Sequence, residues 1–508
     1  MKAFIAFLIL LLAFPVFSQS YMGNLSPQIN SAPTVTNNSC GKGFQSGINS
    51  ITVSGTTATM LTPSLIAGGP CTGVGSSITI KNTFTGQDGT WTLLSAQNTP
   101  PFTYTFTTTS KNVFDHTFRY DHDGSMVKDN SGKIWNFWHE SASEAKDVGW
   151  IEYKTSSDNG TTWTSTVRLF VDSGTSCNGG TQPCDWRNQE AGLASNGNVL
   201  VAWGSHDWNL ASSGWMGMFY SYYNGTSWAS PIPLTIVPRD QNPGAWRWCS
   251  PYGATVSLPG GAIGVTAVGG INKGCAAPYP MYMLISCDNG VTLGTGTGCS
   301  GAMAQYAAKP IRRIAAGGLY SGAVTNEITL AWVGGNTLLG FMRNAQWISG
   351  CKAQCGGGSM IEYVSQDLGL TWTAVVTNLG GYNAGETAYA EVTPILYKPP
   401  AGNLWMLVWG DRFASGGVNQ FALLTLTFDP AAAIANPNGF GAPQVLYSFK
   451  GTALCGYPSI VSTGTNTFLL QWDDEVFGNY LNLFQMTGTF QSSSSAGEKK
   501  NVAPKRTK

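Results

Sequence analysis

Short runs in which apolar and polar residues alternate recur along most of the chain, and many occur in pairs separated by a turn. Such alternation is typical of strands with one buried face, and a turn rich in glycine, asparagine or proline joins two of them into a hairpin. The pattern occurs at 125–127 with 134–138, 193–203, 254–268, 318–332, 392–409 and 459–472. We interpret each as the first hairpin of a sheet, which predicts six sheets.

A repeated turn follows several other strand-like runs. Residues 156–163 read S-x-D-x-G-x-T-W, 365–372 repeat this pattern in full, and 286–293 lack only the tryptophan. A fourth copy at 221–228 has Tyr223 where the aspartate belongs. The copies that begin at 156, 221 and 286 have a constant interval of 65 residues. A fixed interval of this size indicates repeated supersecondary units.

This turn, called an Asp-box, has a structural explanation. Serine and aspartate side chains bond the backbone N–H groups of a tight turn, and glycine supplies a positive φ. The closing tryptophan has a large face to bury between neighbouring sheets. We therefore interpret Asp158, Asp288 and Asp367 as residues that form the fold, between the outer strands of their sheets. The prediction is an all-β fold, a six-bladed β-propeller of four-stranded sheets, which leaves few sheet edges exposed.

Three shorter parts flank the propeller predicted at 111–490. Residues 1–18 have a positive Lys2, an apolar run and small residues near Ser18, as a secretory signal peptide does. Residues 19–110 are rich in threonine, serine and glycine with alternating runs, which predicts a small all-β module before the propeller. Residues 491–508 form a serine run followed by basic residues, which predicts a disordered tail.

Export to an oxidising compartment makes disulfides the expected state of the 11 cysteines. We expect a protein that is secreted, periplasmic or at the cell surface, without a membrane span after signal cleavage. Close neighbours suggest the pairs Cys40–Cys71, Cys177–Cys184, Cys249–Cys275, Cys287–Cys299 and Cys351–Cys355, with Cys455 left over.

Charge and histidine content narrow the function classes. The net charge is +0, so nothing favours nucleic acid or an anionic membrane surface as a partner. The 4 histidines do not cluster with the cysteines, so we expect no metal site. No nucleotide-binding glycine loop is present, and we expect no cofactor. We expect a monomer.

The six predicted sheets, the Asp-boxes and the signal peptide together resemble the sialidase superfamily over roughly residues 115–490. This resemblance implies a glycoside hydrolase that removes terminal sialic acid, or a related sugar acid, from glycans. In this family arginines bind the substrate carboxylate, an aspartate is the acid/base, and a tyrosine polarised by a glutamate attacks the anomeric carbon. Arginine suits a carboxylate because its guanidinium bonds it in bidentate fashion.

The resemblance assigns roles by position. Tyr457, which opens the last predicted sheet, matches the nucleophile, and Glu391 matches its base. Asp147 falls where the acid/base aspartate occurs. Arg119, just before the first sheet, and Arg412 match substrate-binding arginines. The pair Glu391 and Arg412 departs from the family pattern, because it falls in the fifth predicted sheet and the family has its pair in the fourth.

Two other function classes remain open from the residues. One is a non-catalytic propeller that binds a glycan or a protein at the end of the ring. The other is an Asp-box glycosidase that uses two carboxylates, such as Asp147 and Glu391. Three arginines near Tyr457 would favour the sialidase. Two carboxylates that face each other across the axis would favour the two-carboxylate glycosidase. Neutral aromatic residues around the axis would favour the binding protein.

Overall fold

The computed structural model of the chain describes parts of residues 25–492. The described ranges are 25–29, 34–37, 45–47, 50–54, 56–62, 73–81, 89–97, 99, 102–108, 120–141, 148–174, 176–208, 210, 214–271, 280–315, 327–343, 360–379, 387–400, 402–415, 418–441, 443–450, 456–475 and 481–492. The predicted signal peptide and basic tail lie outside these ranges. Within them, the α-helix α1 (Pro430–Ala435) is short, and no helix is long and apolar enough to cross a bilayer.

Six four-stranded antiparallel sheets follow one another along the chain, in the order of their strands. The first three are β9 (Tyr120–Lys128), β10 (Ile134–Ser141), β11 (Trp150–Ser156) and β12 (Val167–Phe170); β13 (Asp185–Leu193), β14 (Val199–His206), β15 (Trp215–Tyr223) and β16 (Ile232–Pro233); and β17 (Trp246–Ser257), β18 (Ile263–Ile271), β19 (Met281–Ser286) and β20 (Ile311–Ala315). The next two are β21 (Ile328–Gly334), β22 (Thr337–Met342), β23 (Ile361–Ser365) and β24 (Thr373–Val376); and β25 (Thr387–Tyr397), β26 (Trp405–Ser415), β27 (Val418–Phe428) and β28 (Gln444–Lys450).

The sixth sheet joins the two ends of the chain. It contains β29 (Gly456–Ser462), β30 (Thr467–Glu475) and β31 (Leu481–Ser492), and its outer strand is β1 (Leu25–Ile29) from the N-terminal part. Strand β1 pairs antiparallel with the far end of β31, from Leu25 opposite Ser492 to Ile29 opposite Gly488. The predicted small module at 19–110 therefore needs a correction, because its first strand belongs to the propeller.

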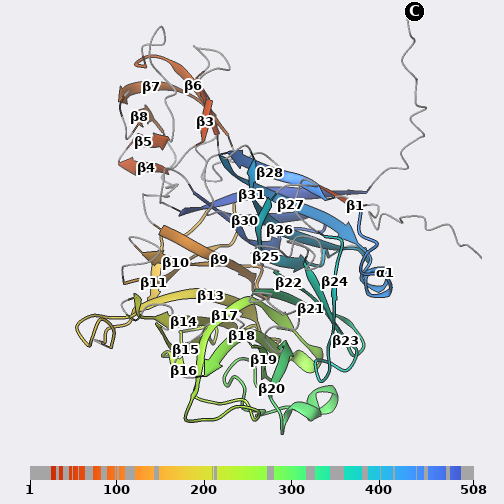
Figure 1. Cartoon of the computed structure of the whole chain (residues 1–508). Coiled ribbons are helices and arrows are strands. Elements are labelled where there is room, and N and C mark those ends of the chain that lie inside the picture. Colours follow the sequence, from red (N-terminus) through yellow and green to blue (C-terminus); the bar gives the residue numbers. More distant parts are fainter. Residues whose placement is uncertain are drawn as a thin grey trace, which may run out of the picture.

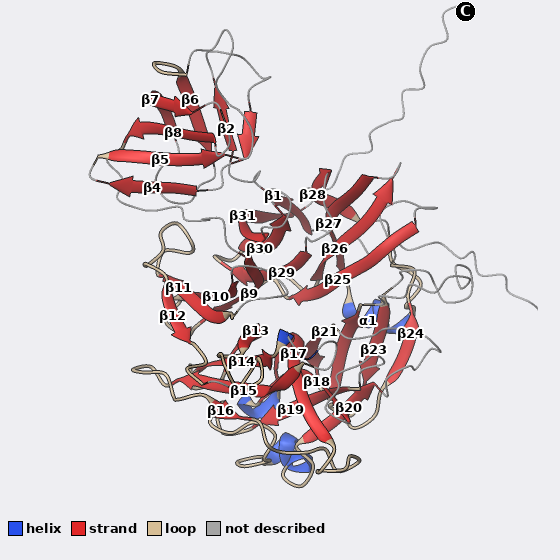
Figure 2. Ribbon diagram, turned by 60° about the vertical axis from the view of Figure 1, so that its left-hand side comes forward, coloured by secondary structure: helices blue, strands red, loops and turns tan. Residues whose placement is uncertain are grey.

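The first strands of the six sheets surround a central axis (Figure 2). Each contacts the first strand of the next sheet, and β9 contacts both β13 and β29, so the ring is closed. Hydroxyl side chains bond neighbouring first strands to each other: Ser125 accepts from the Ala191 N–H, Thr255 donates to the Ala191 carbonyl, Thr329 accepts from the Leu396 N–H, and Ser459 accepts from the Met126 N–H. The predicted all-β, six-bladed propeller is confirmed.

A second, smaller body lies beside the ring and is coloured red to orange in Figure 1. Its strands are β2 (Thr34–Asn37), β3 (Gln45–Gly47), β4 (Ser50–Ser54), β5 (Thr57–Thr62), β6 (Ser77–Lys81), β7 (Gly89–Gln97) and β8 (Phe102–Thr107). They form one seven-stranded arrangement in the order β3-β2-β6-β7-β8-β5-β4. Its core includes Met60, Ile78, Tyr104 and Phe106, all fully buried. The predicted small all-β module is present before the propeller.

The Asp-box turns have the predicted geometry. In the first, Ser156 Oγ donates to Asp158 Oδ1 at 2.7 Å and accepts from the Gly160 N–H at 2.8 Å. Thr162 donates to Asp158 through its N–H and its hydroxyl, at 2.8 and 2.6 Å. The turns after β19 and β23 repeat these bonds. Asn159 has φ +59 and Gly160 φ +88, as a turn built on left-handed conformations requires.

Each Asp-box also connects its sheet to the preceding one. Trp163 of the first sheet packs with Val461 and Leu469 of the sixth, which closes the ring on the outer side as well. Trp228, from the copy without aspartate, packs on the first sheet. Trp372 of the fourth sheet packs on the apolar cluster of the third. The tryptophan that ends the repeated turn therefore packs between adjacent sheets.

Disulfides are consistent with an oxidising environment. Cys177 is bonded to Cys184 and Cys287 to Cys299, as predicted. Cys249 is also disulfide-bonded, to a partner outside the described residues. The other proposed pairs lie outside the described ranges.

Removal of one Asp-box hydroxyl tests the structural role of the turn. Ser156→Ala leaves the Gly160 N–H and Asp158 without their buried partner, and should lower the free energy of unfolding by about 1–2 kcal/mol. Its neighbour Ser157 is exposed, so Ser157→Ala should change the free energy by less than about 0.5 kcal/mol. Denaturant unfolding of both variants gives the comparison, and equal values would contradict the assigned role.

A buried carboxyl group makes the stability depend on pH. Glu362 of β23 is 2% exposed, and its Oε2 has no hydrogen-bond partner among the described residues. Burial raises the pKa of Glu362 to about 8 from 4.5. The folded protein therefore holds a proton that the unfolded chain releases, and stability should fall as the pH rises between these two values.

The isosteric Glu362→Gln variant removes this titration. It should unfold like the natural protein near pH 4, and be roughly 5 kcal/mol more stable near pH 8.5. Denaturant unfolding at the two pH values measures the difference. A stability difference that does not grow with pH would show that Glu362 is ionised in the folded protein.

Candidate functional site

Five of the six first strands have an irregular register near their middle. The pairing shifts opposite Asp123 in β9, between Arg187 and Glu190 in β13, across Gly253 in β17, near Glu391 in β25, and after Gly456 in β29. An extra residue in a strand re-aims the neighbouring side chains, and such bulges often occur next to active sites.

Three of these bulges hold a non-glycine residue in a left-handed conformation. Asp123 has φ +54, Asn188 φ +55 and Tyr457 φ +48. This conformation is unfavourable for residues with a Cβ and persists only where the surroundings impose it. All three residues line the same central cavity of about 230 Å³, with Glu190, Tyr252 and Ser459. The strain is therefore concentrated at the axis of the ring.

Tyr457 is bonded to a glutamate from another sheet. Its hydroxyl donates to Glu327 Oε1 at 3.2 Å, although the two residues are 130 positions apart. Glu327 immediately precedes β21 and is 1% exposed. Arg343, which follows β22, donates from Nη1 to the same Oε1 at 2.5 Å. The backbone joins the pair too, since the Arg343 N–H donates to the Glu327 carbonyl at 2.8 Å.

The charges in this triad stabilise each other. Burial opposes the positive charge of Arg343, but the electrostatic effects of Glu327 and Tyr457 and the hydrogen bonds to them outweigh it and raise the pKa of Arg343. A buried charge without a partner is costly, whereas this carboxylate has a guanidinium and a phenol beside it. A phenol that donates to a carboxylate has a proton acceptor in place, which increases the nucleophilicity of its oxygen.

A second carboxyl group, that of Glu190, also lies at the axis. Glu190 accepts from the Gly253 N–H at 3.2 Å. Burial, with the neighbouring Asp123 and Glu327, raises the pKa of Glu190 to about 8. Glu190 is therefore protonated at neutral pH. Gly253 has φ +114, and a Cβ there would overlap the backbone of Ile328, so only glycine permits this approach of β17 to the strand that follows Glu327.

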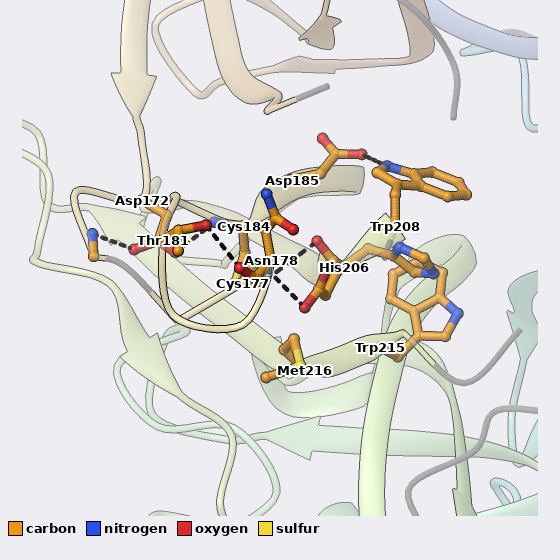
Figure 3. The surroundings of a disulfide bond; sticks show 12 residues. Asp172, Cys177, Asn178, Thr181, Cys184, Asp185, His206, Trp208, Trp215 and Met216 are labelled. Carbon is orange, nitrogen blue, oxygen red and sulfur yellow. Dashed lines mark hydrogen bonds between the residues drawn. A yellow bond between two sulfur atoms is a disulfide. The ribbon is translucent and has the colours of Figure 1, made fainter. Parts of the chain in front are cut away.

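A group of buried polar side chains begins the second sheet, just after the Cys177–Cys184 disulfide (Figure 3). Asp185 accepts from His139 Nε2 at 2.8 Å and from the Trp208 indole N–H at 2.7 Å. Arg187 lies over the Trp208 ring at 4.8 Å, with Nη1 3.7 Å from Asp185. Burial opposes ionisation of Asp185, but His139 and Arg187 lower its pKa.

The same group includes a neutral histidine. His206 lies against the Trp208 ring, with 4.1 Å between the ring centroids. Burial and the charge of Arg187 lower the pKa of His206 to about 4, so the imidazole is uncharged at neutral pH. Arg187 and His206 are therefore held by structural neighbours at the end of the second sheet where β13 begins.

The residues predicted from the sequence have different outcomes. Tyr457 lies at the central cavity as expected. Glu391 lies in β25 opposite Asp411, and Arg412 lies in β26 opposite Tyr389; their side chains are outside the described part of the structure. Arg119 and Asp147 also lie outside it. A described partner of Tyr457 is Glu327, which the sequence did not single out, and the assignment of Glu391 as its base stays a prediction.

Glu327 and Arg343 were not predicted from the sequence, because the apolar alternation predicts the fourth hairpin at 318–332. The hairpin in fact runs from 328 to 342, turning at Gly334 and Gly335. A usable signal was present: Glu327 directly precedes the apolar run 328–333, and Arg343 directly follows the second strand. Both residues therefore frame the hairpin of the fourth sheet, which is where the resemblance expects a glutamate and arginine pair.

Comparisons with known proteins concern the fold alone. No protein-family description matches the chain, and no curated protein matches it. Among solved structures, a protein of unknown function from Dyadobacter fermentans has a TM-score of 0.50 at 17% identity, over 73% of this chain and 95% of that chain. An alpha-L-arabinanase of Penicillium chrysogenum has a TM-score of 0.43 at 11% identity, over 72% and 93% of the two chains. The phage phi92 endosialidase has a TM-score of 0.45 at 9% identity, over 77% of this chain and 70% of that chain.

The site has no arrangement suited to a metal ion within the described ranges. No three histidine, cysteine, aspartate or glutamate side chains there lie in positions that could hold one.

The close approach at Gly253 can be tested by substitution. Gly253→Ala combines a left-handed backbone with overlap against Ile328, and should lower the free energy of unfolding by at least about 3 kcal/mol. Gly335→Ala is the matched control, since Gly335 has φ +54 but open space around its Cβ position, and should cost about 1 kcal/mol. Similar losses from the two variants would contradict the close contact between β17 and β21.

Proposed function

We propose that this protein is an exported, sialidase-like glycoside hydrolase that cleaves a terminal sugar acid from glycans. Tyr457 is the nucleophile, Glu327 is its base, and Arg343 holds Glu327 in position. The observation that supports this most strongly is the hydrogen bond of 3.2 Å from the Tyr457 hydroxyl to Glu327 Oε1. Tyr457 and Glu327 come from the sixth and fourth sheets, so their contact depends on the closed ring.

A phenol suits a substrate that carries its own carboxylate. A carboxylate nucleophile would meet repulsion from such a sugar, whereas a neutral phenol does not. Sialidases with a tyrosine nucleophile are a recognised exception to the two-carboxylate rule for glycosidases. The carboxylate of the substrate also needs cationic partners. We assign this role to Arg119 and Arg412, together with Arg343, whose Nε has no partner among the described residues.

The proposed reaction has two steps, formation of a glycosyl–tyrosine intermediate and its hydrolysis. The Tyr457 oxygen attacks the anomeric carbon and transfers its proton to Glu327, while the leaving oxygen receives a proton from an acid, for which Asp147 is the candidate. Water next attacks the anomeric carbon and gives a proton to Asp147, while the bond from this carbon to the Tyr457 oxygen breaks and Glu327 returns its proton to that oxygen. The configuration at the anomeric carbon is retained because inversion occurs twice.

Release of an aryl aglycone from an aryl sialoside tests this proposal. Tyr457→Phe removes the nucleophilic oxygen and keeps the ring, and should lower kcat by at least about 10³-fold. Glu327→Gln should lower it by about 10²-fold or more. Tyr222→Phe, on the outer strand β15, is the matched control and should retain activity. An intact, folded protein that cleaves no sialoside would contradict the proposal.

A two-carboxylate glycosidase is the second candidate, favoured by one observation. Glu190 is protonated at neutral pH and lies near the carboxyl groups of Asp123 and Glu327, and unequal pKa values in neighbouring carboxyl groups are typical of an acid and a base. This mechanism needs no phenol. Activity retained by Tyr457→Phe but lost in Glu190→Gln would therefore favour the second candidate over the first.

A further inference from the structure

A second cavity, of about 700 Å³, lies on the outer part of the third sheet. One wall is the segment from Ile236 to Asp240, another is the segment from Ala308 to Arg313 that enters β20, and Leu370 of the next Asp-box borders it. None of these residues lines the central cavity. Leu370 follows β23, whose last residue, Ser365, pairs with the beginning of β22.

The groove is strongly basic, although the whole chain has a net charge of +0. Its lining includes four cationic side chains and one acidic side chain: Arg239, Lys309, Arg312, Arg313 and Asp240. Arg313 bonds Asp240 at 3.1 Å. Asp240 also lies 3.3 Å from the Tyr282 hydroxyl, through both of its oxygens. Asp240 is the one carboxylate that lines the groove, and it already contacts Arg313 and Tyr282. The groove therefore has an excess of positive charge.

Arg312 is held in place at the base of the groove. Its Nη2 donates to the Gln305 carbonyl at 3.1 Å, and its guanidinium lies 5.0 Å from the centre of the Tyr306 ring. Its Nε is buried and has no hydrogen-bond partner among the described residues. Burial lowers the pKa of Arg312. A fixed guanidinium with an unused donor is suited to an anionic group.

Apolar surface lies between the cations. Pro238 and Pro310 line the walls with Val237, and Leu370 is 40% exposed at the border. Proline has no N–H group, so these walls offer few backbone donors to a peptide strand. The C–H faces of a sugar ring need only apolar contact, and its acidic groups need guanidinium or ammonium partners. The combination therefore favours an anionic sugar chain over an acidic peptide.

We propose that this groove is a non-catalytic binding site for an anionic polysaccharide, whose carboxylate or sulfate groups bind Arg239, Lys309, Arg312 and Arg313. The site lies apart from Tyr457 and does not depend on the proposed hydrolysis. Linked acidic sugars would place successive charges along the groove while their rings contact the prolines and Leu370. Binding should weaken with salt because exposed cations supply much of the attraction.

The test uses the full-length protein and four polymers: polygalacturonate, dextran sulfate, neutral dextran and poly-L-glutamate. Affinity electrophoresis at about 0.1 M ionic strength gives each Kd. We expect binding to one or both anionic polysaccharides, with preference between them identifying carboxylate or sulfate as the group recognised, and no binding to dextran. Poly-L-glutamate should bind at least about 10-fold more weakly.

Two variants locate the binding site. Arg239→Ser with Lys309→Ser removes two exposed cations that make no ion pair with described residues, and should raise Kd by about 10-fold or more. Lys398→Ser, an exposed lysine at the end of β25, is the matched control and should change Kd by less than about 2-fold. Equal unfolding temperatures would show that both variants are folded.

Several results would overturn the proposal: no binding by the intact protein, an equal effect of the control, or equal binding of poly-L-glutamate. Release of aglycone from a small aryl sialoside should be unchanged in the double variant. Absence of polysaccharide binding and absence of sialoside hydrolysis are therefore separate results, because each has its own assay.

Discussion

Closure of the ring is the constraint on which the rest of the structure depends. The first strand of the propeller, β1, comes from the N-terminal part of the chain and pairs with the last strand, β31. Trp163 closes the same junction from the first sheet. Only in a closed ring do the start of β21 and the start of β29, 130 positions apart, meet as Glu327 and Tyr457. The site therefore forms only while the ring is closed, so a change that opens the ring also separates Glu327 from Tyr457.

The centre of this ring is where the chain departs from regular structure. The Asp-boxes use left-handed residues in exposed turns, where the conformation forms a tight turn. At the axis the same conformation occurs inside strands, at Asp123, Asn188 and Tyr457, where it disrupts pairing. Strained residues and buried carboxyl groups both lower stability. Their concentration around one cavity, with Arg343 and Gly253 holding the neighbouring carboxyl groups, is typical of a site maintained for chemistry.

Most of the fold could be predicted from the sequence, because alternation, turns and Asp-boxes are local signals. The strand β1 could not be assigned, since its partner β31 is at the other end of the chain. The residues of the site were harder to predict from the sequence for the same reason. Tyr457 was identified by its place at the start of a sheet, but the hairpin of the fourth sheet was placed about ten residues early, which hid Glu327. Glu391 was assigned from its resemblance to the glutamate strand of the family, whereas the contact between Glu327 and Tyr457 is visible only in three dimensions.

The central claim, that the Tyr457 oxygen is the attacking atom, is tested most directly by trapping the covalent intermediate. A fluorinated sialosyl fluoride, which forms the glycosyl–enzyme normally but hydrolyses slowly, is incubated with the protein, and the digested protein is analysed by mass spectrometry. The account predicts one sugar on the peptide that contains Tyr457, and none when Glu327 is replaced by glutamine. A sugar attached to Glu190 or Glu327 instead, or turnover of sialosides with inversion at the anomeric carbon, would contradict it.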